Sequence, residues 1–173
     1  MNGACELRTT GETMKKILIA VDDTKGTKYA FEMCTHVCSC IRPEAVLLVY
    51  VQKLEGRSLM DDQLLSVSEM KTLKEVLEGT EYQEALDKRA QKILAHYRKA
   101  LEDKGVTGVR SILRKGHPAE EILATAKEED AEMIVIGSRG KRTTRLFMGS
   151  VSREVANGAE VPVLLVPSSA RGE

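Results

Sequence analysis

Tryptophan is absent from this sequence, and aromatic residues make up only 3 % of it. Proteins that bind single-stranded nucleic acid stack successive bases on aromatic side chains, so the chain offers few platforms for that purpose. Neither sign of charge is in excess, because 26 basic side chains balance 26 acidic ones. The chain therefore lacks the net positive charge that typifies a nucleic-acid binder, and we expect no nucleic-acid partner.

Long hydrophobic runs are also missing. No apolar segment approaches the roughly 18 to 20 residues that cross a bilayer. Residues 1–13 are polar and lack the apolar centre of a secretory signal peptide. We therefore expect a cytoplasmic protein without a membrane span. The length suits one domain, which we place at residues 14–168, after a flexible arm (1–13) and before a short tail (169–173).

Cysteine is scarce, and three of the four cysteines lie within residues 34–40, together with His36. This spacing invites a metal site, but no second pair of Cys or His residues lies elsewhere to complete a tetrahedral set. Cys34 and Cys38 are four residues apart, which puts both on the apolar face of a predicted helix. Free cysteine behaves there as a small hydrophobic residue, so we expect core cysteines and no bound metal.

The apolar residues alternate between two kinds of segment. Near-continuous apolar runs, typical of parallel strands buried on both faces, occupy residues 16–22, 45–51, 133–136 and 161–166. A further strand is expected at residues 109–113. Helices are expected in five segments: after Thr24, at 60–78, at 82–103, from Pro118 onward, and at 150–158. In the helix after Thr24 the apolar positions include Met33. This alternation predicts an open α/β fold with a parallel sheet.

Ligands of such folds bind at the carboxyl ends of the strands, near the point where the strand order reverses. Gly137 and Gly140 come directly after the strand 133–136, and the pair Gly149-Ser150 opens the next helix. Bare backbone N–H groups, a Ser hydroxyl and a helix N-terminus can surround a phosphate in this way. The loop between them is basic, with Arg139, Lys141, Arg142 and Arg145. The alternative is a glycine-rich turn with a solvated basic rim, since short glycine motifs often occur by chance.

Other nucleotide and catalytic signatures are absent. Asp22-Asp23-Thr24 occupies the turn after the first strand, where a dinucleotide-binding domain has its glycines. Gly140-Lys141 is followed by Arg142, whereas the phosphate loop of NTPases has Ser or Thr there. No segment has the local signature of a nucleophile, so we predict no catalytic residue.

Five segments together resemble the universal stress protein family in its single-domain form. They are KILIAVDDT (16–24), GHPAEEI (116–122), IVIGSRG (134–140), GSVS (149–152) and VPVLLVP (161–167), and the resemblance covers about residues 14–168. It implies a five-stranded parallel sheet in the order 3-2-1-4-5 with helices on both faces, the Rossmann-like fold of the adenine nucleotide alpha hydrolase type. It also implies a role in stress or regulatory response, and a homodimer formed through the strand 161–166.

The resemblance further implies a set of nucleotide-binding residues. Asp22 would lie beside the adenosine, and the backbone of Tyr50 and Val51 would read the adenine edge. Gly137 and Gly140 would let the backbone approach ribose and phosphates, with Arg139 reaching the phosphates. The Ser150 hydroxyl and the Val151 N–H would hold phosphate oxygens, and Gly149, without a side chain, would leave room for the phosphates to reach them. Two alternatives remain open: an Asp22 carboxylate that caps the following helix, and an Arg139 that is merely solvated.

One departure from the family pattern concerns the phosphate loop. Nucleotide-binding members have nine residues between the second glycine and Gly-Ser, whereas here eight residues, 141–148, lie between Gly140 and Gly149. Shortening a loop by one residue costs little entropy, so we expect an adenine nucleotide, ATP with or without Mg²⁺. The alternatives are a nucleotide-free dimeric interaction protein of the same fold, and a slow ATPase. A carboxylate placed to activate water is not evident in the sequence.

Overall fold

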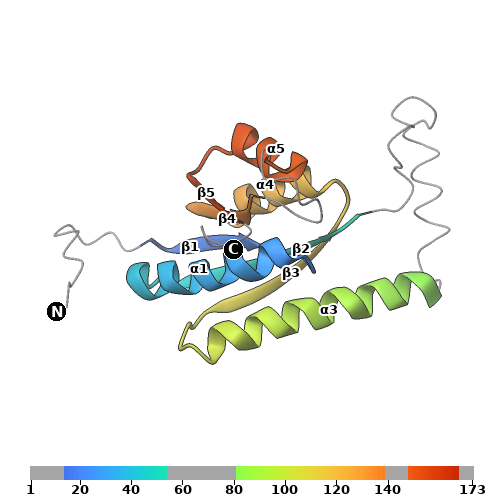
Figure 1. Cartoon of the computed structure of the whole chain (residues 1–173), viewed down its shortest axis with the longest axis horizontal. Coiled ribbons are helices and arrows are strands. Elements are labelled where there is room, and N and C mark those ends of the chain that lie inside the picture. Colours follow the sequence, from blue (N-terminus) through green and yellow to red (C-terminus); the bar gives the residue numbers. More distant parts are fainter. Residues whose placement is uncertain (1–13, 54–80, 139–147, 168–173) are drawn as a thin grey trace.

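The computed structural model describes residues 14–53, 81–138 and 148–167 (Figure 1). Its five strands form one parallel sheet in the order β3-β2-β1-β4-β5. Their bounds are Lys16–Ala20 (β1), Ala45–Gln52 (β2), Val109–Lys115 (β3), Met133–Gly137 (β4) and Val163–Val166 (β5). The predicted fold class and strand order are confirmed. The expected helix at 60–78 lies outside the described residues.

Helices cover both faces of the sheet. Those described are α1 (Lys25–Ile41), α3 (Glu81–Glu102), α4 (Pro118–Glu128) and α5 (Ser150–Gly158). In Figure 1, α1 and α3 lie on one side of the sheet, and α4 and α5 lie on the other. Because side chains of a strand alternate between faces, Leu48 packs in the core beneath α1 and α3, whereas Leu47 packs beneath α4 and α5.

The structure corrects several expectations about the elements. The first strand was expected over 16–22 but ends at Ala20, and the third was expected over 109–113 but extends to Lys115. The last strand was expected over 161–166 but begins at Val163, because Pro162 has no N–H to donate. The Pro162 carbonyl still accepts a hydrogen bond from Ile134 N at 2.9 Å. Met33 does not belong to the buried stripe of α1 and is 40 % exposed. Cys34 and Cys38 are buried in the core, as predicted.

Candidate functional site

The reversal of strand order lies between β1 and β4. The chain leaves β1 for β2 and β3 on one side, and later returns to place β4 and β5 on the other. Open α/β sheets have their ligand crevice at such a reversal, outside the carboxyl ends of the strands, which here are those of β1 and β4. Asp22 follows β1, Gly137 ends β4, and Tyr50 and Val51 lie near the end of β2. The parallel topology therefore brings these sequence-predicted residues to one edge of the sheet.

Asp22 is held by a residue of its own loop. Its Oδ1 accepts hydrogen bonds from the Thr24 N–H at 2.8 Å and from the Thr24 hydroxyl at 2.6 Å. Thr24 is buried and immediately precedes α1. These contacts close a turn between Asp22 and Thr24 immediately before α1, and neither goes to an N–H of the helix itself. They also fix the orientation of the carboxyl group at the edge of the crevice.

The end of β2 presents different groups to its two sides. Val49 O accepts a hydrogen bond from Val21 N at 2.9 Å on the β1 side, and Gln52 O accepts one from Gly116 N at 3.0 Å on the β3 side. Backbone groups of a strand alternate between its two neighbours, so the N–H and C=O of Val51 face the β1 side. The β1–β2 pairing stops at Ala20 and Val49, which leaves the Val51 groups beyond the end of the ladder.

The Tyr50 side chain lies on the face of the sheet that α1 and α3 cover, whereas the Val51 side chain lies on the other face. Burial raises the pKa of Tyr50, and the nearby charges of Asp23 and Asp22 raise it further, while Arg89 opposes them. The phenol is therefore neutral at physiological pH. The Tyr50 backbone N–H and C=O face β3, as those of Gln52 do, and lie within the β2–β3 ladder.

One hydrogen bond joins the two ends of the glycine loop, and a second connects Ser138 to β5. Ser138 O accepts from Gly149 N at 2.8 Å, and Ser138 N donates to Val166 O at 2.7 Å. The buried Ser152 hydroxyl lies 3.0 Å from both Ser138 O and Gly149 O. The start of α5 is thereby fixed against the end of β4. Arg139 and Gly140 lie outside the described residues.

The N-terminus of α5 carries no side-chain cap. Gly149 is the N-cap residue, with φ −63° and ψ 154°, and it has no side chain that could accept a hydrogen bond. The first N–H groups of any helix lack acceptors within the helix. At α5 these include the N–H groups of Ser150 and Val151, beside the exposed Ser150 side chain. Such a terminus attracts anions through its N–H groups and the helix dipole.

Sequence reasoning missed a polar group where α3 meets the ends of β2 and β3. Gln83 Nε2 donates to Gln52 Oε1 at 3.2 Å and to Asp87 Oδ1 at 2.9 Å, and Lys115 Nζ lies 3.1 Å from Asp87 Oδ2. Desolvation raises the pKa of Asp87, but Gln52, Gln83 and Lys115 outweigh it and lower the pKa overall. The buried Gln52 Nε2 makes no hydrogen bond with a described residue. Gln52 nevertheless contributes to the lowered pKa of Asp87.

His117 belongs to the segment GHPAEEI and immediately precedes α4. It is the N-cap residue of α4, but its side chain makes no capping hydrogen bond. The half-buried ring lies between two carboxylates, with Nε2 3.6 Å from Glu154 Oε2 and Nδ1 4.0 Å from Glu120 Oε1. Pro118 at the start of α4 lacks an N–H, which leaves one fewer unpaired donor in the first turn of the helix.

Burial makes Cys34 and Cys38 poor nucleophiles. Burial raises the pKa of Cys34, with the neighbouring Cys38 adding to the effect, and burial alone raises the pKa of Cys38 to about 11. Both thiols are therefore protonated at physiological pH, whereas nucleophiles and metal ligands are thiolates. Within the described part of the chain, His, Cys, Asp and Glu residues form no group of three or more that could hold a metal ion.

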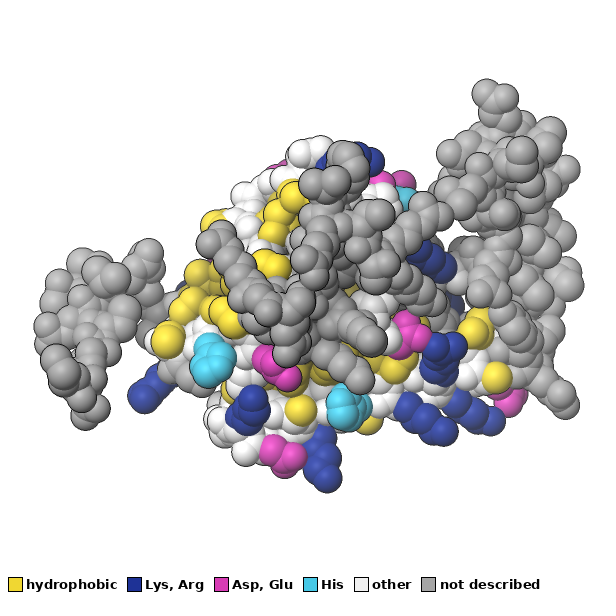
Figure 2. Space-filling model, in the orientation of Figure 1, with side chains coloured by type: hydrophobic (Ala, Val, Ile, Leu, Met, Phe, Trp, Pro, Cys, Tyr) yellow, Lys and Arg dark blue, Asp and Glu magenta, His cyan; other side chains and the backbone are white. Residues whose placement is uncertain are grey.

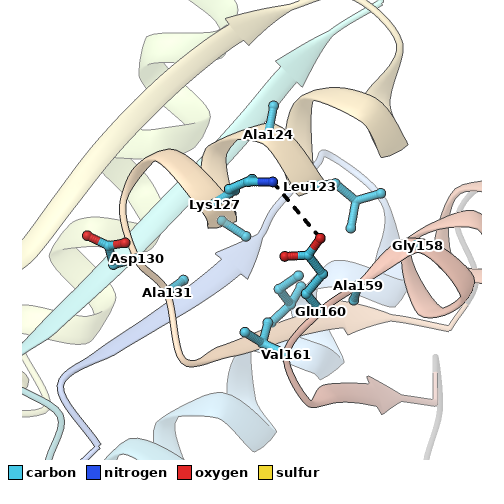
Figure 3. A pocket seen from close by; sticks show the side chains of 11 residues that line it. Leu123, Ala124, Lys127, Asp130, Ala131, Gly158, Ala159, Glu160 and Val161 are labelled. Carbon is cyan, nitrogen blue, oxygen red and sulfur yellow. Dashed lines mark ion pairs between the residues drawn. The ribbon is translucent and has the colours of Figure 1, made fainter.

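A groove of about 380 Å³ lies away from the crevice, between the ends of α4 and α5 (Figure 3). Asp130 and Ala131 of its lining precede β4, and Glu160 and Val161 precede β5, so it lies at the amino ends of the strands. Lys127 points toward Glu160 across it, with 4.0 Å between Nζ and Oε1. None of the sequence-predicted site residues lines this groove.

No helix in the described ranges is long and apolar enough to cross a membrane. Fold and crevice together define a doubly wound α/β protein with an uncapped helix terminus at the point where its strand order reverses. The chain belongs to the universal stress protein family, whose family model matches residues 13–167. The family predicted from the sequence motifs is confirmed.

Relatives of similar length carry the same assignment. Universal stress protein MJ0577 of Methanocaldococcus jannaschii is 30 % identical over 158 residues, which cover 88 % of this chain and 94 % of the relative. YxiE of Bacillus subtilis is 30 % identical over 154 residues, covering 87 % and 97 %. The solved structure of MJ0577 superimposes with a TM-score of 0.70 at 28 % identity and covers 92 % of this chain and 99 % of that chain.

More distant structures share the fold and contain adenine nucleotides. An Arabidopsis thaliana family member with AMP bound has a TM-score of 0.59 at 18 % identity, covering 91 % of this chain and 94 % of that one. A universal stress protein in complex with cAMP has a TM-score of 0.62 at 15 % identity, covering 91 % and 100 %. The Archaeoglobus fulgidus protein in complex with dAMP has a TM-score of 0.53 at 21 % identity, covering 90 % and 99 %.

Proposed function

We propose that this universal stress protein binds an adenine nucleotide at the carboxyl ends of β1, β2 and β4, and acts as a regulatory protein in a stress response. The observation that carries the proposal is the N-terminus of α5. It has no side-chain cap, is fixed to the end of β4 through Ser138, and lies where the strand order reverses. Such a terminus suits a phosphate.

The phosphate end of the ligand falls to the glycine loop. The Val151 N–H and the Ser150 hydroxyl and N–H would donate to phosphate oxygens, and the bare backbone of Gly149 leaves room for them. Gly137, Gly140 and Arg139 complete the phosphate and ribose contacts in this proposal. The roles of Gly140 and Arg139 are inferred from the sequence motif alone, because both lie outside the described residues.

The adenosine end falls to β1 and β2. Adenine presents an acceptor and a donor side by side on its Watson–Crick edge, which matches one residue's backbone N–H and C=O. Val51 offers these two groups beyond the end of the β1–β2 ladder, next to Tyr50. Asp22 would accept a hydrogen bond from the ribose, because a carboxylate after a strand commonly reads ribose hydroxyls.

Relatives make adenine nucleotides the first choice of ligand, since family members with AMP, cAMP and dAMP have been solved. We favour ATP, with or without Mg²⁺, because a basic loop of four cations in residues 139–145 suits several phosphates. Backbone donors and cations stabilise ground state and transition state alike, and such uniform binding does not speed chemistry. We therefore propose regulatory binding in the cytoplasm rather than efficient hydrolysis.

Self-association is part of the proposal. β5 is an edge strand with half-buried apolar residues, and a bare apolar edge invites pairing with another chain. Antiparallel pairing of two copies would cover it and give a two-fold dimer.

Identification of the bound ligand tests the nucleotide proposal. We expect mass spectrometry of the small molecules released on denaturing the purified protein to find AMP, ADP or ATP near one per chain. A protein that releases none, and binds none in equilibrium dialysis at millimolar nucleotide, would instead be an interaction protein that has lost the site.

A further inference from the structure

Helix α3 reaches across to the loop that carries Asp22. Tyr97 Oη donates a hydrogen bond to the backbone O of Asp22 at 3.3 Å. Arg89, just over two turns earlier on the same helix, forms an ion pair with Asp23. Two consecutive residues of the loop are thus tied to one helix that lies far away in the sequence.

Asp22 and Asp23 lie beyond the last backbone pairing of β1 with its neighbour β2. The last backbone bond between the β1 segment and β2 is Val21 N to Val49 O, at 2.9 Å. Beyond it, the Asp22 carboxylate is oriented by Thr24, but Thr24 belongs to the same loop. The contacts from Tyr97 and Arg89 connect this loop to α3.

Tyr97 is well placed to act as a fixed support. The residue is 4 % exposed, and its ring lies 4.8 Å from that of Phe31 in α1. Burial and the contact with Phe31 therefore hold the Tyr97 ring in place. Burial raises the pKa of Tyr97 to about 12, with the charges of Asp22 and Asp23 contributing, so the hydroxyl keeps its proton and remains a donor.

Arg89 differs from the other paired basic residues of α3. Lys and Arg side chains follow the length of this helix on the face shown in Figure 2. Lys88 and Arg98 pair within the helix, with Glu84 and Glu102, whereas Arg89 pairs with the loop. Because the Arg89 side chain is 61 % exposed, solvent and salt weaken this pair.

We propose that Tyr97, assisted by Arg89, is a positioning residue of the nucleotide site, which holds the Asp22 loop so that its carboxylate faces the adenosine. The inference rests on the proposed function and adds α3 to the elements that build the site. A binding group must be held within about 0.5 Å of its productive position. Loss of the Tyr97 hydroxyl therefore weakens adenosine contacts and leaves phosphate contacts unchanged.

The test separates the two ends of the ligand. Titration calorimetry compares AMP with inorganic tripolyphosphate on wild type, Tyr97→Phe, Arg89→Met and the matched control Arg98→Met. We expect Tyr97→Phe to weaken AMP about threefold to tenfold, the range for one lost hydrogen bond. Arg89→Met should weaken AMP about twofold to fivefold at low salt. The control should bind as wild type does, and tripolyphosphate affinity should be the same in all four proteins.

A double-mutant cycle decides whether Tyr97 acts through Asp22. In an Asp22→Ala background, the Tyr97→Phe change should have no further effect on AMP affinity. Equal weakening of both ligands, or a full Tyr97→Phe effect in that background, would show general destabilisation and overturn the inference. Tyr97→Phe with wild-type AMP affinity would also overturn it. A wild-type protein that binds no AMP would overturn the proposed function, and this inference with it.

Discussion

Ser150→Pro should remove a proposed phosphate donor from the proposed nucleotide site without removing the helix. Ser150 is the first residue of α5, and Gly149 before it is extended, with φ −63° and ψ 154°, a conformation that a following proline accepts. Helix α4 already begins in this way, with Pro118 after an extended His117 at φ −76° and ψ 119°. Proline at this position removes only an N–H that the helix does not use.

The expected loss follows from the bonds removed. Ser150→Ala removes the hydroxyl, and Ser150→Pro removes the backbone N–H as well. A hydrogen bond to a charged group contributes about 1.5–3 kcal/mol, so Ser150→Pro should bind ATP about tenfold to a hundredfold more weakly than Ser150→Ala.

Titration calorimetry with ATP measures this difference, and adenosine, which has no phosphate, is the control ligand. Thermal unfolding followed by circular dichroism checks that all three proteins keep the fold. Equal ATP affinity in Ser150→Pro and Ser150→Ala, with the fold intact, would refute a phosphate at the α5 N-terminus. A matching loss of adenosine affinity would point to a disturbed fold instead.

Three further predictions concern stability and assembly. Ser152→Ala should lower the free energy of unfolding by about 1 kcal/mol, because the buried hydroxyl holds Ser138 and Gly149; urea denaturation measures it, and unchanged stability would contradict this role. Burial raises the pKa of Cys38 from 9.0 to about 11. The stabilisation that comes from keeping this thiol protonated in the folded state is therefore fully present below pH 9. The free energy of unfolding falls between pH 9 and 11, where the thiol loses its proton in the unfolded state but keeps it in the folded state. Cys38→Ala should flatten this fall in thermal unfolding, and an equal slope would count against it. Leu165→Pro should convert a sedimenting dimer into a monomer, because Pro162 and Val166 use their carbonyls toward β4 and residue 165 therefore faces outward; a wild-type monomer at micromolar concentration would exclude the dimer.

The fold could be predicted because each element has a local signal. The apolar run of β4 and the bounds of α5 at Ser150–Gly158 both follow from composition and spacing. The start of β5 was predicted two residues early because Val161 is apolar. Pro162 limits pairing there, which is a backbone effect that hydrophobicity does not register.

The supports of the site could not be predicted because they join distant positions. Tyr97 lies 75 residues from Asp22, and Arg89 lies 66 residues from Asp23. Helical spacing indicates that Tyr97 faces the core, but not which carbonyl its hydroxyl reaches. Ser152 stands in the GSVS motif, yet its hydroxyl acquires its two acceptors only when β4 and α5 meet.

Nuclear magnetic resonance gives the most direct test of the central claim, that an adenine nucleotide binds at the carboxyl edge of the sheet. Backbone amide shifts are followed while ATP is added to ligand-free protein, with GTP as the control. We predict that the amides of Ser150, Val151 and Asp22 shift with ATP, while those of Glu160 and Val161 at the opposite edge do not. Unchanged amides at Ser150 and Val151, or shifts confined to the groove at Glu160, would contradict the account.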